Sequence, residues 1–309
     1  MHRIMSIKKF WFLVIIYNLV GTIGFATKYA GEFQDLIVGG RVCGMGGTGV
    51  AQGNDLSALL LNPALSPFLQ RSLQFMHAEN FSGVVKNEFG ALVITQKNLA
   101  YGLGFQLVSV GGIKLTTLPD TTRPPGYDNQ PIPYDTVATH DWVFYLNAGK
   151  TKNFFAYGLN LKFYYRDLSV LRGWGAGVDG GLRFALKNFT WGISIRDIIL
   201  SPIYWESDNR EYIASKIAIG GAPQIPLDQI NSVLIIETDI VKDLAQDDFF
   251  LLQGIELAFR QRIYGRVGRY GERLTAGVGL RYQRLLFDYG LITHNDLGIS
   301  NKFSLLVQF

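Results

Sequence analysis

The last nine residues of the chain alternate between apolar and polar side chains. Phe303, Leu305, Val307 and Phe309 occupy every second position, and the chain ends on Phe309 itself. Because successive side chains of a β-strand point to opposite faces of a sheet, this period of two predicts a strand. Termini of soluble domains are usually polar and frayed. In a transmembrane barrel a terminal aromatic residue lies at the membrane interface, and we interpret Phe309 as the signal for barrel assembly.

The same alternation recurs in about fourteen segments after Arg71. Most are near the ~9–11 residues that a tilted strand needs to cross a bilayer. An even number of strands places both ends of a bacterial barrel on the periplasmic side. The predicted strands are Ser72–Phe81, Glu88–Gln96, Ala100–Gly112, Val137–Lys150, Phe155–Asp167, Gly175–Leu186, Thr190–Asp197, Tyr212–Ala222, Val233–Val241, Leu251–Phe259, Arg262–Gly268, Leu274–Gln283, Leu285–Ile292 and Ile299–Phe309.

The composition agrees with a membrane barrel. Hydrophobic residues make up 48% of the chain, aromatic residues 13% and charged residues only 17%. After residue 26 no run reaches the 18 consecutive apolar residues of a helical span. We therefore expect an all-β fold, a transmembrane antiparallel β-barrel of about 14 strands over residues 71–309, with an apolar outer band and aromatic girdles.

Residues 1–26 have the pattern of a secretory signal peptide. Arg3, Lys8 and Lys9 precede an apolar run from Phe10 to Val20, and small residues stand before a cut after Ala26. The alternative is a membrane-anchor helix, which needs about 20 apolar residues, more than this run supplies. A signal peptide followed by a barrel predicts the outer membrane of a Gram-negative-type bacterium.

The net positive charge of the chain does not indicate a class of partner. Without the three basic residues of the signal, 26 basic and 25 acidic residues remain of the 29 and 25 in the whole chain. A nucleic-acid partner is therefore not expected. Cys43 is the single cysteine, which excludes an internal disulfide and suits a small buried apolar residue.

Residues 27–70 differ from the rest because they are rich in glycine and do not alternate. Asn54 and Asp55 could cap a short helix over Leu56–Leu61, which Asn62-Pro63 would end. A glycine pattern around Gly44 superficially resembles a phosphate loop, but no strand clearly precedes it, and the pattern alone is weak. We expect instead a plug segment inside the barrel, where glycine permits close approach of backbones.

Connection lengths alternate between short and long, as expected for periplasmic turns and external loops. Three predicted short turns share a Lys-Asn-apolar sequence, and Asn suits the left-handed conformation of tight turns. They are residues 97–99, 152–154 and 187–189. The Pro-rich connection Lys114–Thr136 is the candidate for an external contact. Pro223–Asn231 is the exception, because it is long for a periplasmic turn.

The strand alternation assigns charged residues to the inside of the barrel, because each would cost a few kcal/mol facing lipid at mid-depth. Buried charges are normally paired, so we expect ion pairs within the lumen and with the plug. The alternative is a basic patch that guides a substrate. The same alternation of inward and outward positions, applied to the strand Phe155–Asp167, places Lys162 and Arg166 inside. The candidate lumen charges are Asp179, Arg183, Glu237, Asp239, Glu256, Arg260, Arg262, Arg266 and Arg281.

Catalytic and metal-binding patterns are poor. His77, His140 and His294 are scattered after the signal, and no His/Cys cluster has the spacing of a metal site. We predict no catalytic residues, no metal and no cofactor, and hence a protein that is not an enzyme.

The glycine-rich segment resembles a known family. Residues 40–51 (GRVCGMGGTGVA), 54–58 (NDLSA) and 62–64 (NPA) resemble the N-terminal segment of the PorV/PorQ group of outer-membrane proteins. This group lies in the wider superfamily of FadL-type long-chain fatty-acid transporters. Residues 265–270, 275–282, 287–289 and 297–298 look like that group's C-terminal end. The match spans roughly residues 38–68 and 254–309. Its plug motif is Gly44, Met45, Gly46, Gly47, Asn54, Asp55, Asn62 and Pro63.

The resemblance implies a 14-stranded barrel plugged by the segment that ends at Gln70. For the PorV branch it implies association with a protein-secretion apparatus of the type IX kind, as scaffold or cargo partner. For the FadL branch it implies passage of hydrophobic molecules through a lateral opening. The chain is shorter than most members, which implies reduced external loops. Expected partners are outer-membrane lipid, the barrel assembly machinery, and exported proteins or secretion subunits, or else hydrophobic small molecules.

Export is the first hypothesis, supported by the terminal motifs and the charged lumen. A FadL-like transporter is the alternative, and it predicts an apolar pocket that reaches the plug beside a kinked strand. A structural porin is the third, and it requires the segment around Gly44 to lie outside the lumen.

Overall fold

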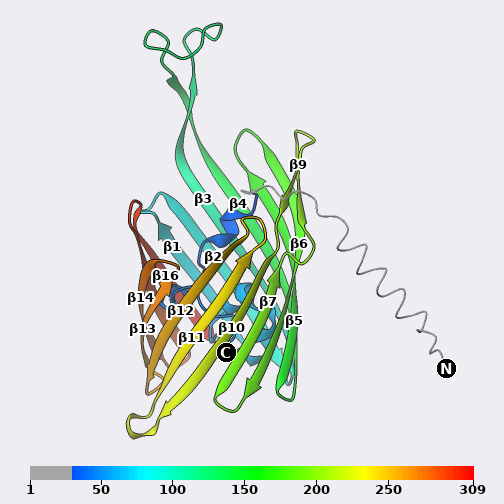
Figure 1. Ribbon diagram of the computed structural model, residues 1–309, viewed down its shortest axis with the longest axis vertical. Helices are drawn as coiled ribbons and strands as arrows, with labels where there is room; N and C mark the ends of the chain where they lie inside the picture. Colours follow the sequence, from blue (N-terminus) through cyan, green and yellow to red (C-terminus); the bar gives the residue numbers. More distant parts are fainter. Residues whose placement is uncertain (1–29) are drawn as a thin grey trace, which may run out of the picture.

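The computed structural model describes residues 30–309, which form a closed antiparallel β-barrel (Figure 1). The predicted signal peptide, residues 1–26, lies outside the described residues. Each wall strand pairs with the next along the chain, except that β7 pairs with β10, and β1 pairs with β16 to close the barrel. Within residues 30–309 the fourteen wall strands are β1 (Ser72–Asn80), β2 (Val85–Gln96), β3 (Leu99–Thr117), β4 (Ile132–Lys152), β5 (Phe155–Asp167), β6 (Arg172–Leu186), β7 (Phe189–Arg196), β10 (Lys216–Leu227), β11 (Ser232–Asp243), β12 (Asp248–Phe259), β13 (Ile263–Tyr270), β14 (Arg273–Tyr282), β15 (Leu285–His294) and β16 (Gly298–Gln308).

The closing pair confirms the role of the C-terminal alternation in the fold. β1 and β16 pair from Ser72 opposite Gln308 to Glu79 opposite Asn301. The Phe309 N–H donates a hydrogen bond of 3.0 Å to the Arg71 carbonyl, which extends the ladder to the last residue. A barrel closed in this way has no free edge strand in its wall.

Two short strands were not predicted. The predicted strands leave residues 198–211 as a connection, but β8 (Ser201–Trp205) and β9 (Arg210–Ile213) form a hairpin that pairs with the outer part of β6. The expected single strand Tyr212–Ala222 is therefore divided, and β10 begins at Lys216. Ser201, Ile203 and Trp205 are buried at every second position, but this signal is short, and polar residues follow it.

The short turns lie at the end of the barrel where the chain terminates. The positive φ values in the Lys-Asn turns belong to Lys97 (54°), Asn153 (58°) and Lys187 (50°), so lysine and not asparagine takes this conformation in two of these three. β10 continues to Leu227, and only η3 (Asp228–Ile230) and one further residue separate it from β11. The expected exception at Pro223–Asn231 is thus mostly strand.

One connection rises far beyond the opposite rim (Figure 1). β2 pairs with β3 only as far as Val110, and β5 pairs with β4 only as far as His140. Beyond these residues β3 and β4 pair only with each other. We call residues 111–139 the external arm. The predicted loop Lys114–Thr136 is thus partly strand. At its tip the Asn129 amide accepts from the Asp120 N–H (3.1 Å) and donates to the Asp120 carbonyl (2.9 Å).

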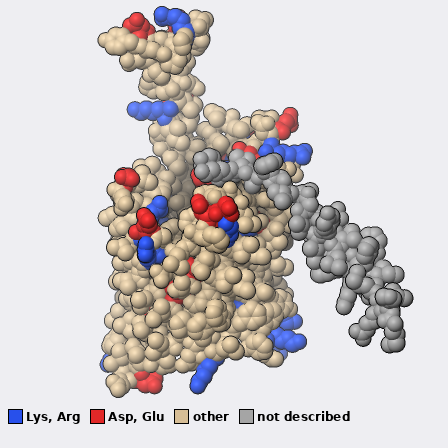
Figure 2. All heavy atoms as spheres, in the orientation of Figure 1, with Lys and Arg blue, Asp and Glu red and all other residues tan. Residues whose placement is uncertain are grey.

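The outer wall is apolar between two charged ends. In Figure 2 the visible barrel surface is largely uncharged at mid-height, and charged side chains gather toward both rims. Exposed outward side chains include Leu161, Leu257 and Val278. Among the described residues, no helix is sufficiently long and apolar to cross a membrane.

The N-terminal part of the described chain lies inside the barrel (Figure 1). It contains η1 (Glu32–Asp35), α2 (Gly40–Gly44), α3 (Ala58–Leu61) and η2 (Pro63–Phe68). We call residues 30–70 the inner segment. Every residue from Val38 to Ala51 is buried. Its helices are too short to be stable alone, so their stability comes from contacts with the barrel wall.

Candidate functional site

A chain of buried ion pairs holds α2 against the wall. The Arg41 Nε donates to Glu256 Oε2 on β12 at 3.1 Å. Arg266 on β13 contacts the same carboxylate oxygen at 2.6 Å and Asp288 on β15 at 2.5 Å. All four side chains are at most 2% exposed. Removing one member of such a buried pair leaves an uncompensated charge and is strongly destabilising.

Two carboxylates of β11 hold the next stretch of the inner segment. Asp239 Oδ2 accepts hydrogen bonds from the N–H groups of Gly49 (2.9 Å) and Val50 (3.1 Å). Glu237 Oε1 accepts from those of Ala51 and Gln52, both at 3.0 Å. Four consecutive backbone donors, which have no ladder of their own, are thereby satisfied.

Other predicted lumen charges also meet the inner segment or each other. Arg183 Nε donates to the Ala51 carbonyl at 3.1 Å. Asp179 pairs with Lys162 at 2.6 Å, and Lys162 also contacts Asp197 at 2.8 Å. Arg281 Nη1 donates to the Gln308 side chain at 2.8 Å, inside the wall near the periplasmic end.

Arg260 and Arg262 are the two predicted lumen charges that the structure places elsewhere. They lie in the turn between β12 and β13, and both are exposed. Arg260 has a positive φ of 50°. Because β12 ends at Phe259 and the backbone reverses there, the alternation of the strand does not continue into these residues.

The predicted plug motif contacts the wall through backbone and small side chains. Met45 is fully buried, and a Cβ on Gly44 would lie only 2.9 Å from the Cα of Gly277. Gly46 and Gly47 have φ values of +68° and +81°, which side chains rarely adopt. Asn62 donates to the carbonyls of Val50 and Leu182 and accepts from the Ala64 N–H. Pro63 begins η2.

The predicted cap of the short helix is wrong in detail. α3 begins only at Ala58, and its N-cap residue, Ser57, makes no capping hydrogen bond with its side chain. Asp55 instead accepts from the Ser57 hydroxyl at 2.7 Å. The Asn54 side-chain oxygen is buried without a hydrogen-bond partner among the described residues.

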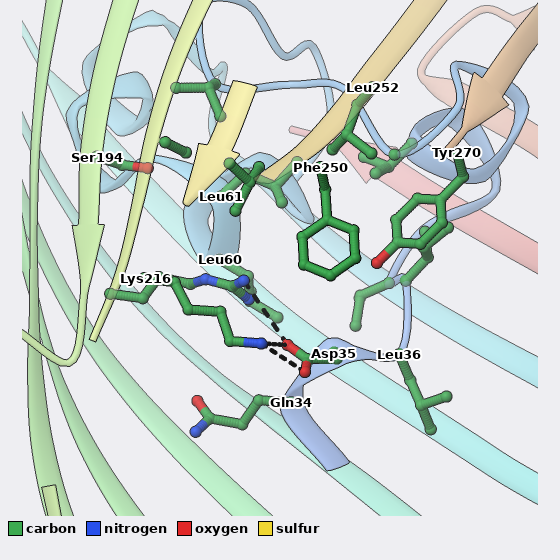
Figure 3. A pocket seen from close by; sticks show the side chains of 18 of the residues that line it. Gln34, Asp35, Leu36, Leu60, Leu61, Ser194, Lys216, Phe250, Leu252 and Tyr270 are labelled. Carbon is green, nitrogen blue, oxygen red and sulfur yellow. Dashed lines mark hydrogen bonds and ion pairs between the residues drawn. The ribbon is translucent and has the colours of Figure 1, made fainter. Parts of the chain in front are cut away.

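A cavity of about 130 Å³ lies between the inner segment and the wall strands β7 and β10–β13 (Figure 3). Its apolar part is formed by Leu36, Leu60 and Leu61 of the inner segment, which face Phe250 and Leu252 of β12. The cavity therefore depends on the inner segment for one side and on the barrel for the other.

The other end of the cavity is polar. Lys216 of β10 lies 2.6 Å from Asp35 Oδ2 (Figure 3). It also lies 2.8 Å from Asp243 Oδ2. Arg196 Nη2 lies 3.8 Å from Asp35. Ser194 and Tyr270 also line the cavity and carry hydroxyl groups. The two cations and two carboxylates balance, so the cavity carries no net charge.

Sequence reasoning missed this ionic group. Parity on β10 could have placed Lys216 inside, two residues before the inward Ala218. No pattern could have paired Lys216 with Asp35, because the two are 181 positions apart and meet only through the course of the inner segment.

Within residues 30–309, no cluster of three or more His, Cys, Asp or Glu side chains could hold a metal ion. The three histidines lie on different strands: His77 on β1, His140 on β4 and His294 on β15. Cys43 is a free, fully buried thiol on α2.

No protein-family model matches the chain, and no curated protein matches it. Solved structures do. The toluene transporter TbuX of Ralstonia pickettii shares 13% identity at a TM-score of 0.58, over 88% of this chain and 98% of that one. The toluene transporter TodX of P. putida shares 12% identity at 0.56, over 87% and 97%. The monoaromatic hydrocarbon channel CymD shares 12% identity at 0.57, over 88% and 97%.

The three structures named above are two toluene transporters and a monoaromatic hydrocarbon channel. None of them supports the PorV/PorQ group over the wider superfamily. The agreement covers nearly the whole chain, including the closed wall of fourteen strands. The protein therefore has the fold of the FadL-like barrels. Its closed wall with an apolar outer surface locates it in the outer membrane of Gram-negative bacteria.

Proposed function

We propose that this barrel carries hydrophobic small molecules across the outer membrane and that the cavity beside residues 34–38 binds its cargo. The cavity is the observation that carries the proposal. An apolar cavity of ~150 Å³ can hold benzene, so a volume of about 130 Å³ suits a molecule with one small ring. Toluene, which is named for TbuX and TodX, is an appropriate probe.

The polar end of the cavity favours a neutral cargo. Lys216 has two carboxylate partners within 2.8 Å, so it offers little free charge to an anion. Burying a charged ligand beside apolar Leu60 and Phe250 would also cost desolvation energy. A neutral ring avoids both costs, and a hydroxyl substituent could bond to Tyr270 or Ser194.

β10, which lines the cavity with Lys216 and Ala218, has a gap in its pairing with β11 closer to its other end. β10 and β11 pair from Lys216 to Gly221 and again from Gln224, but Ala222 and Pro223 between them have no partner on β11. Proline has no N–H to donate to the ladder. The register of β10 against β11 is the same on both sides of these two residues, so they form a weakened stretch of the wall and not a kink, and we propose this stretch as the place of lateral passage.

Filling the cavity tests the proposal. Ala218→Phe places a phenyl ring in the cavity, whereas the control Val278→Phe places one on the lipid-facing side of β14. We expect fluorobenzene to bind the native chain and Val278→Phe equally, as measured by ¹⁹F NMR, and binding to Ala218→Phe to fall at least tenfold. Uptake of labelled toluene by cells that express each chain should follow the same order. Equal binding by all three proteins would contradict the cavity as the site.

Export remains the second candidate, because the inner segment is sealed in place by Arg41, Glu237 and Asp239 and resembles that of the PorV/PorQ group. Native mass spectrometry of the protein gently extracted from its own membranes distinguishes the two roles. A stoichiometric secretion subunit or exported protein, together with no fluorobenzene binding, would favour export. Bound apolar molecules without a protein partner favour transport.

A further inference from the structure

A ring of basic side chains surrounds the periplasmic end of the barrel. Eight exposed Lys and Arg residues lie in or beside the short turns, and we call them the periplasmic basic ring. They are Arg71, Lys97, Lys150, Lys152, Lys187, Arg260, Arg262 and Arg284. Within residues 30–309, Asp228 is the one acidic side chain in these turns. Several of the basic residues appear along the lower edge of the barrel in Figure 2.

The ring is not neutralised by the protein. None of its members forms an ion pair with another described residue. The external end is different, because acidic side chains lie among its basic ones, and three of these form ion pairs: Arg123 with Asp120, Arg172 with Asp167, and Lys242 with Asp247. The periplasmic turns are thus almost purely basic, whereas the external end carries both signs of charge.

The position of the ring relative to the membrane follows from its aromatic neighbours. Phe154 lies in a turn of the ring and is 61% exposed, Trp191 is 48% exposed and Tyr282 is 65% exposed. Exposed aromatic residues of this kind lie at the level of the lipid headgroups. The adjacent ammonium and guanidinium groups then lie at the level of the lipid phosphates.

We propose that the periplasmic basic ring binds the phosphate groups of anionic phospholipids in the periplasmic leaflet. The basic residues are spread over six positions around the circumference, with the β10–β11 turn as the exception. A single docked protein would require a patch on one side, whereas a surrounding leaflet matches a ring. Each Lys or Arg near an anionic surface strengthens binding several-fold, and the effect weakens with salt.

Trp191 permits a local test of this proposal. It lies on β7, close to Lys187 in the preceding turn. A chain in which every other tryptophan is replaced by Phe is reconstituted in vesicles that contain brominated phosphatidylglycerol or brominated phosphatidylcholine. Bromine quenches tryptophan on contact, so quenching reports which lipid occupies the ring. We expect phosphatidylglycerol to bind at least fivefold more strongly, and we expect 0.5 M salt to reduce the preference.

Three controls make the outcome decisive. Replacing Lys150→Gln, Lys152→Gln and Lys187→Asn together should abolish the preference, and Asn suits the positive φ of position 187. Replacing three external basic residues, Lys86→Gln, Lys114→Gln and Arg172→Gln, should leave it unchanged. A matched reporter with Trp174 alone, near the external rim, should show no preference. Equal quenching by both lipids at Trp191, or a preference that survives the turn substitutions, would overturn the proposal.

Discussion

At the scale of single residues, Glu237 and Asp239 determine how the inner segment is held. They are two positions apart on β11, so both point into the lumen, and together they accept four successive backbone N–H groups. Parity predicted their inward direction from the sequence. It could not predict their partners, because residues 49–52 reach β11 only after the inner segment has folded.

Replacing Asp239→Leu should destabilise the barrel by about 2–4 kcal/mol, because two buried N–H groups lose charge-assisted hydrogen bonds. Ile240→Ala is the matched control on the same strand, since Ile240 faces outward and is 51% exposed. Urea unfolding in lipid vesicles measures both. A loss for Asp239→Leu no larger than that of the control would show that the two hydrogen bonds are not needed.

At the scale of elements, strands were predicted correctly where apolar and polar residues alternate over a long segment. The prediction failed at turns and for very short strands. Period two located all fourteen wall strands. It failed for Arg260 and Arg262, because the chain turns at Phe259, and it missed β8 and β9, which are only five and four residues long. The glycines of the inner segment distinguished it from the strands in the sequence. The start of α3 was not predictable, because Asp55 accepts a hydrogen bond from the Ser57 hydroxyl and does not cap the helix as expected.

The burial of α2 makes Cys43 a reporter of the inner segment. Burial raises the pKa of this thiol to about 11, so at pH 8 almost none of it is the reactive thiolate. We expect maleimide to label it at least a hundredfold more slowly in the folded protein than in the urea-unfolded chain. The substitution Glu256→Gln weakens the attachment of Arg41. In this variant we expect Cys43 to be labelled faster than in the native protein at urea concentrations that do not unfold the barrel.

The matched control for this measurement moves the thiol to an exposed loop. A chain with Cys43→Ala and Ser169→Cys should react rapidly whether folded or not, because position 169 is exposed. Rapid labelling of Cys43 in the native protein would contradict the prediction, because it would mean that α2 frequently detaches from the barrel wall.

At the scale of the whole molecule, the lumen of the barrel contains the inner segment, held by contacts with many wall strands. The wall contributes ionic partners from β5, β6, β11, β12, β13 and β15, and the inner segment contributes close backbone contacts such as Gly44 against Gly277. Fold class and membrane location followed from the sequence, because alternation and composition are properties of the entire chain. The cavity did not, because its volume depends on side chains from six separate regions.

A filled barrel should conduct poorly. In planar bilayers we expect no steady large-channel current from the native protein, and we expect frequent openings from the double variant Glu237→Leu/Asp239→Leu, whose inner segment has lost four hydrogen bonds. Val278→Phe serves as a control for inserted, folded protein. A steady large current from the native protein would contradict the plugged arrangement.

The external arm has a separate consequence for how such a protein can diverge. Beyond Val110 and His140 its strands pair only with each other, so matched insertions or deletions there leave every hydrogen-bond register of the wall unchanged. The tip is organised by Asn129 and Asp120 within the arm itself. Changes in the length or sequence of the arm should therefore have little effect on the stability of the barrel, so this region is free to diverge while the transmembrane wall is kept.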